Sequence, residues 1–593
     1  MGIERFFNSL KTKYGEQIIN NIDIVELNSE YLFVDFNSII HTISQDISDS
    51  MIKLYHYYLI SLKNNNYILD NKNYIDSLLH NLNINQINQS FFDSFNKSDK
   101  LDIIIISKIC EYILYLINLF KNLKYIYLAI DGVPMYAKQL EQKRRRLIGH
   151  IINKSKNLLL EYYKDELNIN SNNNNIYYNH YQFELNIKKF KFDKNKISPA
   201  TKFMTLLEST LNEFLIKCKY IQFYIDSYNN FGEGEKKICN QIHKMKIKLN
   251  SNITIYSPDA DMILLMLLES DKYKVNILRY DQQLKKLEVI DINILNNIIS
   301  NYISEKSSKF IIKDIVMIFT ILGNDFLPKI EIINTNKHIT KILDAYKKTI
   351  INKDFIFDNK INWKLLYRFF INLEDNFKHI KIEEIYRNKK WKINENQLIN
   401  NNAINYYIHL FNLENLCGQY NPDKQNNKYS NKRIDENYMN TYIIDYLTGF
   451  KWLYEYYINY NEKYKLYSYN HSRIPTISQL IIFIDKINTK QIILSLDKYY
   501  IDDKKYFVPI TQLLFITPMK IHSIVDNKLL NNHTKKIINK YYKLYKTNYN
   551  IKIINSKLNI FHILDCKNIM YINKCNIKNE NKIDVNILLN TLN

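Results

Sequence analysis

The chain has 593 residues, which is too long for one typical hydrophobic core, so we expect at least two domains with ample buried interior. Its 81 lysines and arginines exceed the 60 acidic residues and give a formal net charge of +21, which favours a polyanionic partner such as nucleic acid, although AT-rich codons alone would also enrich lysine. The six cysteines show no CxxC spacing, which argues against disulfides and zinc and favours a nuclear or, as we expect, a cytoplasmic protein.

The first apolar segments predict neither an export signal nor a membrane helix. The opening MGIERFF lacks the apolar core of a signal peptide. The most apolar run, residues 103–120, contains Lys108 and Glu111 within a span that a membrane helix would need uncharged. We therefore expect this run to form a helix in the core.

Four short runs rich in β-branched and aromatic residues predict strands at 31–36, 125–131, 220–226 and 253–259. Each is followed by a helical pattern. This alternation predicts an α/β fold with a mostly parallel central sheet flanked by helices, in which ligands bind beyond the carboxyl ends of the strands. Three of the four strand ends carry an aspartate, namely Asp35, Asp131 and Asp259.

The segment after the second strand predicts a strongly basic helix that begins with Pro134, a residue suited to a first helical turn. At about 100° per residue, four side chains share one flank of this helix beside an aspartate. They are Lys138, Gln142, Arg145 and Arg146. Such a face could bind a terminal phosphate. A nuclear-localisation signal or a solvated basic helix would explain the same spacing equally well.

The sequence gives weaker signals for the insertion after this helix and for the domain boundary. An Asn-rich stretch around 168–180 cannot bury a core and predicts a surface insertion. After about residue 350 the alternation of strands and helices fades, and tyrosine-rich helical patterns continue. We therefore predict an α/β domain over 1–350 and a mainly helical region over 351–593 that packs on it.

Seven acidic residues stand at or near the ends of strands or at the starts of helices. They are Asp35, Asp131, Glu233, Glu235, Asp259, Asp261 and Asp325. If they share one sheet edge they need a counter-charge, because two like charges about 4 Å apart repel by roughly 4 kcal/mol at an effective dielectric of about 20. Oxygen ligands without His or Cys suit Mg²⁺ or Mn²⁺. Two such ions would support phosphodiester hydrolysis.

The stretch FGEGEKK places two of the nine glycines, Gly232 and Gly234, between acids. Glycine lets the backbone approach a ligand closely and adopt a positive φ. A phosphate-binding loop is an alternative, but the spacing lacks both GxxxxGK[ST] and the third glycine of a dinucleotide fingerprint. An isolated pair of acids two residues apart is otherwise common on solvated surfaces.

Together these motifs resemble the XRN family of 5′-to-3′ exoribonucleases. The resemblance lies in VDFNSIIH, AIDGVPMYAKQLEQKRRR, GEGEKKI, DADMILLML and GNDFLP, in this order, after the opening MGIERFF. It extends more weakly to YLTGFKWLYEYY (446–457) and HSRIPTISQL (471–480), which look like the second conserved region of the family. The chain would then be a compact member with the nuclease core alone, as a large DNA virus could encode.

The resemblance implies a PIN/FEN-like nuclease core and a role in RNA decay, including mRNA decay. The seven acids would bind two Mg²⁺ ions, with Mn²⁺ as a substitute. Lys138, Gln142, Arg145 and Arg146 would bind a 5′-monophosphate, and His41 would stack on a base near the 5′ end. The expected substrate is single-stranded RNA with a 5′-monophosphate, degraded processively to 5′-mononucleotides by a monomer that needs no membrane.

The sequence also departs from the family pattern. Glu4, Ser38 and Pro258 replace residues usual in the family, and none of them is a proposed ligand. In the second region Tyr464 and Leu466 stand where family tryptophans are expected, so no residue is assigned to the second half of the base-stacking clamp. A flap-type DNA nuclease and a catalytically inactive RNA-binding scaffold are the alternative functions. FLPKIEIINTNKHI lacks the glycines of a flap-nuclease hairpin, and the retained acids argue against an inactive scaffold.

Overall fold

The computed structural model describes most of residues 3–526 and, beyond them, Lys535. Not described are the long segments 154–182 and 378–435 and a number of shorter gaps. The predicted Asn-rich insertion at 168–180 lies outside the described residues.

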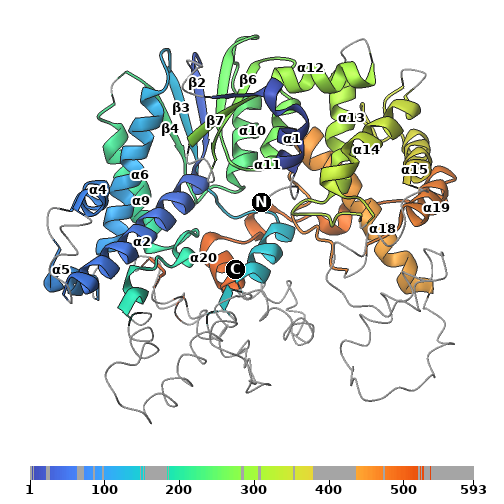
Figure 1. Ribbon diagram of the computed structural model, residues 1–593. Coiled ribbons are helices and arrows are strands. Elements are labelled where there is room, and N and C mark those ends of the chain that lie inside the picture. Colours follow the sequence, from blue (N-terminus) through green and yellow to red (C-terminus); the bar gives the residue numbers. More distant parts are fainter. Residues whose placement is uncertain are drawn as a thin grey trace, which may run out of the picture.

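A twisted sheet in the order β1-β7-β6-β5-β2-β3-β4 forms the centre of the described structure (Figure 1). The five strands from β6 to β4 are parallel, whereas β7 pairs antiparallel with β6 and β1 pairs antiparallel with β7. The strands are β1 (Ile19–Asn21), β2 (Tyr31–Asp35), β3 (Tyr125–Ala129), β4 (Gln222–Asp226), β5 (Asn252–Tyr256), β6 (Lys274–Asp281) and β7 (Lys286–Asp291). The four predicted strands and the α/β fold class are confirmed, and β1, β6 and β7 are additional.

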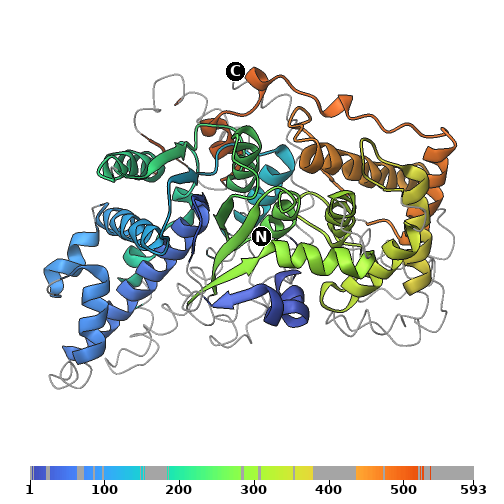
Figure 2. The same cartoon turned by 90° about the horizontal axis from the view of Figure 1, so that it is seen from above.

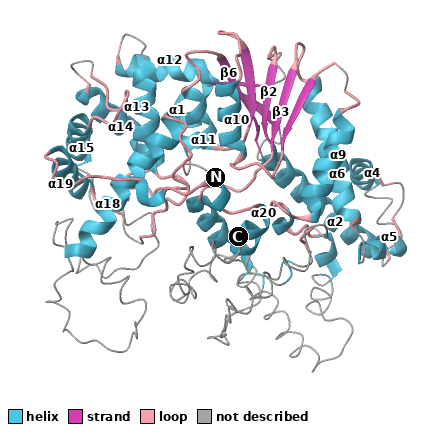
Figure 3. Cartoon of the chain, turned by 180° about the vertical axis from the view of Figure 1, so that it is seen from behind, coloured by secondary structure: helices cyan, strands magenta, loops and turns pink. Residues whose placement is uncertain are grey.

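Side chains alternate between the two faces of this sheet because successive residues of a strand point to opposite sides. In β2, Phe33 belongs to one hydrophobic core, whereas Leu32 and Val34 belong to the other. The sheet is therefore covered by helices on both faces, as Figure 3 shows from behind. Registration of Asp35 with Ala129, and of Ala129 with Asp226, brings the carboxyl ends of three strands to one edge.

The first layer of helices packs against the face with Leu32 and contains the predicted core helix (Figures 1 and 2). It comprises α2 (Phe36–Ser61), α4 (Lys72–Leu82), α5 (Gln89–Asp93), α6 (Lys100–Asn118) and α9 (Lys202–Leu215). In α6, Ile105, Ile109 and Ile113 are buried, which confirms the core-helix prediction. No helix among the described residues is long and apolar enough to cross a membrane.

The second layer covers the face with Phe33 and continues into the C-terminal region. It comprises α1 (Phe6–Ile18), α10 (Gly234–Lys244), α11 (Ala260–Leu267), α12 (Ile292–Ile303), α13 (Lys309–Phe319), α14 (Thr335–Thr349) and α15 (Trp363–Phe377). These are joined by α18 (Glu436–Leu453), a π-helical turn (Tyr454–Ile458) and α19 (Ile477–Asn488), whereas α20 (Pro509–Ile516) packs separately beneath the sheet edge (Figure 1).

One continuous hydrophobic core joins the N-terminal and C-terminal parts of the described chain, with members from Ile3 to Leu496. At its centre, the indole ring of Trp452 lies 5.0 Å from the ring of Phe326. Helix α15 packs on both α14 and α19. The division near residue 350 therefore stays a prediction, because packing runs across it without a break.

Candidate active site

The acidic residues expected at one sheet edge come from five separate parts of the fold. Asp35 ends β2 and Asp131 follows β3. Two pairs occupy helix starts, where the first acid is the N-terminal cap and the second lies in the first turn: Glu233 and Glu235 at α10, and Asp259 and Asp261 at α11. Asp325 lies in the loop after a 3-10 turn that ends at Leu322. Parallel strands therefore bring these acids toward one edge, as the strand-end rule predicts.

Both glycines of the GEGE stretch have a structural reason. Gly232 has a φ of 107°, a left-handed conformation that favours glycine. At Gly234 an added Cβ would lie 2.8 Å from Asp35 Oδ1 and 3.3 Å from Asp131 Oδ1, so only glycine fits between these carboxylates. The N–H of Gly234 donates to Asp131 Oδ1 at 2.6 Å. The expected close backbone approach is thus observed.

Burial and mutual repulsion act strongly on these acids. Burial, together with the charges of Asp131 and Asp259, raises the pKa of Asp35 to about 8. Burial and the neighbouring acids likewise raise the pKa of Asp261 to about 7 and that of Glu235 well above its ordinary value. A group of acids that resists ionisation together needs a compensating positive charge.

Within the protein, Lys138 supplies part of that charge. Its Nζ lies 2.7 Å from Glu233 Oε1 and 2.5 Å from Asp325 Oδ2. Arg145 adds a contact of 3.2 Å to Asp325, and these cations hold the pKa of Asp325 below its ordinary value despite burial. The structure therefore turns Lys138 toward the acids. Among the described residues no three acids surround one point closely enough to bind an ion.

The chemistry of these residues nevertheless fits divalent cations. A cavity of about 10 Å³, near the space of one water molecule, lies among the acids and the rings of Tyr456 and Tyr457. Its acidic wall consists of Glu233, Glu235, Asp261 and Asp325. The donors are all oxygen, as Mg²⁺ and Mn²⁺ prefer. A cation would add to the neutralising charge of Lys138.

The basic helix begins at residue 136, two residues later than expected. Pro134 lies before it, and its carbonyl accepts hydrogen bonds from the Tyr506 hydroxyl at 2.8 Å and from the side chain of Gln139 at 3.1 Å. Arg144 is exposed, whereas Lys143 is half-buried and lies over the ring of Phe515.

Among the described residues, Arg146 of this helix forms no ion pair with an acid, although the charge of Asp193 acts on it from a longer distance. Its guanidinium donates to Ser198 Oγ at 2.7 Å and to Thr517 Oγ1 at 3.4 Å, both of which are neutral. Within the described structure no carboxylate lies in ion-pair range of it, and burial lowers its pKa to about 10. Gln142 accepts a hydrogen bond from Gln512 on α20 at 3.2 Å. A buried guanidinium held only by hydroxyls is suited to an incoming anion.

His41 lies on α2 between these two groups. Its side chain is exposed, yet local desolvation lowers the pKa of the imidazole, and the nearby charges of Lys194 and Arg146 lower it further while Asp131 opposes them. A neutral ring next to both the acids and Arg146 is consistent with stacking on a base. The role of each predicted site residue stays a prediction.

Sequence reasoning missed two residues of this site. Ser257, directly after β5, donates to Asp35 Oδ2 at 3.1 Å and accepts from the N–H of Asp259 at 3.2 Å, which links two acids. Lys236 is buried, and its Nζ lies 4.5 Å from the ring centre of Tyr456 and 4.4 Å from that of Tyr460. The position of Ser257 after a strand was an available signal. Nothing in the sequence pairs Lys236 with tyrosines 220 or more residues away.

Comparison with known proteins finds a family that the first part of the chain resembles. The sequence model described as the XRN 5′-3′ exonuclease N-terminus matches residues 1–93 and 55–281. This match confirms the resemblance seen in the sequence motifs, and the matched range contains six of the seven predicted acids, all but Asp325.

The XRN relatives differ in how much of their length is shared. The chain is 26% identical to the "Putative 5'-3' exonuclease R528" of Acanthamoeba polyphaga mimivirus, over 71% of this chain and 94% of that protein. It is 27% identical to 5'-3' exoribonuclease 1 of Saccharomyces cerevisiae and 23% identical to that of Homo sapiens, over 44% and 48% of this chain. The matched part is 18% of the length of each of these two cellular relatives.

Proposed function

We propose that this chain is a 5′-to-3′ exoribonuclease that hydrolyses single-stranded RNA bearing a 5′-monophosphate. The observation that carries the proposal is the proximity of the acids to Arg146, because His41 is acted on by the charges of both Asp131 and Arg146. Within the described structure, no carboxylate lies in ion-pair range of this arginine. The match to the XRN family model supports the same activity, and the relatives named 5'-3' exoribonuclease support RNA as the substrate.

In this proposal the acidic residues bind metal ions, and basic and amide side chains bind the RNA phosphate. The seven acids would hold two Mg²⁺ ions, which supply an activated water and neutralise the leaving oxygen when bound. Arg146 and Gln142 would bind the 5′-phosphate, with the planar guanidinium offering two parallel donors. Lys138 and Arg145 would keep the acids in place, because both contact Asp325. His41 would stack on the first base and align the scissile phosphate with the acids.

Processive release of 5′-mononucleotides, a monomeric state, a role in mRNA decay and a cytoplasmic location belong to the proposal. They rest on the family resemblance.

One experiment tests the central claim. Single-stranded RNAs of equal sequence bearing a 5′-monophosphate, a 5′-triphosphate or a 5′-hydroxyl, and the matching DNA, are incubated with the full chain and Mg²⁺. We expect stepwise loss of mononucleotides from the monophosphorylated RNA and much slower decay of the others. Equal or internal cleavage of all RNAs would overturn end recognition. Preference for the DNA would favour the flap-type nuclease, and binding without cleavage in Mg²⁺ or Mn²⁺ would favour the inactive scaffold.

A further inference from the structure

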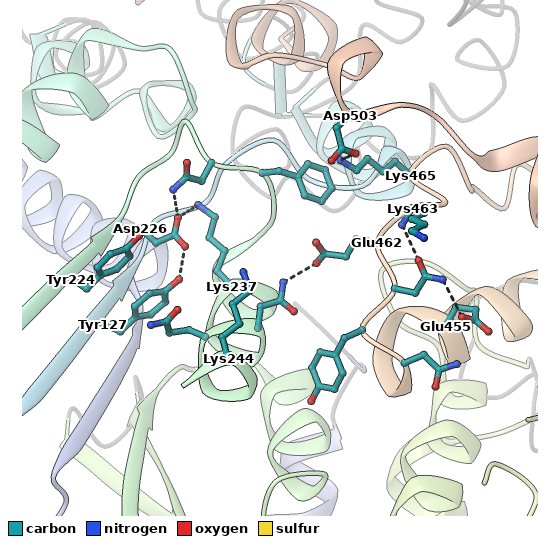
Figure 4. Close-up of a pocket in the computed structure, with 17 residues that line it drawn as sticks. Tyr127, Tyr224, Asp226, Lys237, Lys244, Glu455, Glu462, Lys463, Lys465 and Asp503 are labelled. Carbon is teal, nitrogen blue, oxygen red and sulfur yellow. Dashed lines mark hydrogen bonds and ion pairs between the residues drawn. The ribbon is translucent and has the colours of Figure 1, made fainter. Parts of the chain in front are cut away.

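A second, larger cavity of about 730 Å³ lies next to the acids, against β3 and the edge strand β4 (Figure 4). Its walls come from the two strands, from α10 and from the segment 455–465. As Figure 4 shows, Tyr127, Tyr224 and Asp226 form the sheet side, and Glu455, Glu462 and Lys463 form the opposite side. The volume is in the range of small-molecule sites.

The sheet side of this cavity offers an aromatic surface. The rings of Tyr127 and Tyr224 are parallel, with an interplanar angle of 5° and centres 5.5 Å apart. Tyr127 is fixed because its hydroxyl donates to Asp226. Tyr224 is 48% exposed, so much of its ring is uncovered. A flat heterocycle can stack on such a ring.

The lysines of the cavity fall into two classes. Lys237 donates to Asp226 and to two backbone carbonyls, and Lys465 is paired with Asp503 at 2.9 Å, so both are compensated within the protein. Lys244 and Lys463 are exposed and, in the part of the chain that the structure describes, have no carboxylate within 4.0 Å. These two cations, on different walls, are the ones available to a phosphate.

Carboxylates and amides complete the lining. Glu462 accepts from the side chain of Asn240 at 3.1 Å, which leaves its second oxygen for another donor. Asp226 accepts from Asn230 at 2.8 Å and also from Tyr127 and Lys237, so both of its oxygens have partners within the protein. A carboxylate with a remaining acceptor oxygen, such as Glu462, can bind the hydroxyl groups of a ribose. The cavity thus combines a stacking ring, hydroxyl acceptors and free cations, which are the partners of base, sugar and phosphate.

The cavity is separated from the acids by little more than the start of α10. Lys236 lines the acidic cavity and the next residue, Lys237, lines the larger one. Likewise, Tyr456 lines the acidic cavity and Tyr460 lines the larger one, and the Nζ of Lys236 lies over both rings. A nucleotide released at the acids therefore has this cavity as its immediate neighbour.

We propose that the larger cavity binds a nucleoside 5′-monophosphate and receives the mononucleotide product. The inference rests on the proposed function for the source of that ligand, whereas the binding itself does not require nuclease activity. The base would stack on Tyr224, the ribose would meet Glu462, and the phosphate would bind Lys244 and Lys463. No bond is made or broken in this site.

The test measures binding of adenosine 5′-monophosphate to the full chain by isothermal titration calorimetry in EDTA. Tyr224→Ala removes the stacking ring and Lys463→Glu reverses one free cation. Their matched controls are Tyr220→Ala, which removes a ring that is 98% exposed, and Lys248→Glu, which reverses an exposed charge outside the cavity. We expect each cavity variant to bind about tenfold more weakly and each control to bind as the parent does.

Further arms separate the possible outcomes. Adenosine and inorganic phosphate alone should each bind more weakly than the nucleotide. If the parent does not bind the nucleotide, or if Arg146→Gln abolishes binding while both cavity variants leave it unchanged, the cavity is not the site and the inference is wrong. Failure of the RNA assay would overturn the proposed nuclease function and would leave this binding result standing on its own. In an active protein, the cavity variants should also relieve inhibition of RNA decay by added nucleotide.

Discussion

Glu235 is half-buried in the first turn of α10, where desolvation and the charges of Asp259 and Asp261 disfavour its ionised form. Its carboxylate therefore destabilises the folded chain unless a cation neutralises the cluster. We expect Glu235→Gln, which keeps the shape and removes the charge, to reduce RNA hydrolysis by at least about 100-fold. In EDTA the same variant should melt about 1–3 °C above the parent, because one repelling charge is gone.

Glu16→Gln is the control for this pair of measurements, since Glu16 is an exposed residue of α1. It should change neither hydrolysis nor melting. Unchanged activity of Glu235→Gln would remove this glutamate from the catalytic group. A fall in the melting temperature in EDTA would show that Glu235 has a stabilising partner in the folded chain that outweighs repulsion.

Arg146 provides the second prediction, because the described partners of its guanidinium are two hydroxyls. Charge-assisted hydrogen bonds contribute about 1.5–3 kcal/mol each. Arg146→Gln should therefore raise KM for 5′-monophosphorylated RNA by about 10- to 100-fold while leaving KM for 5′-hydroxyl RNA nearly unchanged. The control is Arg144→Gln on the exposed side of the helix, paired with Glu141. Equal losses on both RNAs would mean that Arg146 acts on RNA in general and not on its end.

At the scale of elements, the sequence predicts the parts of the fold that follow local rules. The four central strands are apolar runs, and the acids at their ends are placed by parallel topology. Strand β1 consists of Ile19, Asn20 and Asn21, a sequence without strand preference that forms by pairing with β7. In β6 and β7, lysines and aspartates at the strand ends obscure the apolar pattern.

The sequence likewise predicts the parts of the site that follow local rules. The acids and the basic helix are readable because each stands next to a predicted strand or helix start. The sequence does not predict the direction of the Lys138 side chain. Its two acidic neighbours come from α10 and from the loop after Leu322, and their approach depends on tertiary packing. For the same reason the contact of Gln512 with Gln142, across 370 residues, has no sequence signal.

Asp314 gives a prediction for how elements are joined. This buried residue of α13 accepts hydrogen bonds from the Tyr346 hydroxyl of α14 and from the backbone N–H groups of Ile356 and Phe357. Burial raises its pKa to about 7, and Asp358 adds repulsion that the three donors oppose. Between about pH 4 and pH 7 the folded chain thus retains a proton that the unfolded chain releases. Stability contributed by this group falls as the pH rises through that window.

We expect Asp314→Asn to remove this part of the pH dependence, a free-energy change of about 4 kcal/mol across the window. At pH 5 the variant should be less stable than the parent by about 1–3 kcal/mol, because the amide NH₂ meets a backbone donor. The difference between parent and variant should shrink toward pH 7.5. Melting temperatures across pH measure both effects, with the exposed Asp485→Asn as control. A parallel offset at all pH values would contradict the assigned pKa.

At the scale of the whole molecule, the N-terminal and C-terminal parts enclose the site together. Tyr456 and Tyr457 of the C-terminal part line the acidic cavity, and Tyr506 binds the carbonyl of Pro134 before the basic helix. At Gly449 an added Cβ would lie 1.9 Å from the Tyr467 hydroxyl, so α18 packs too closely there for any other residue. Such contacts depend on shape complementarity, which no periodic sequence pattern predicts. The sequence therefore predicts only that the C-terminal part is mainly helical.

This shared enclosure predicts how the chain responds to metal. Cations that bind the folded cluster and not the unfolded chain stabilise by mass action, by about 2.7 kcal/mol at a concentration 100 times Kd. Because one core spans Ile3 to Leu496, we expect a single cooperative melting transition that moves upward as a whole when Mg²⁺ or Mn²⁺ replaces EDTA. In Glu235→Gln the upward movement should be much smaller, since one ligand and one repelling charge are absent. Two transitions, of which the metal moves only one, would instead show that the region beyond about residue 350 unfolds independently and that the cluster is formed by the N-terminal part alone.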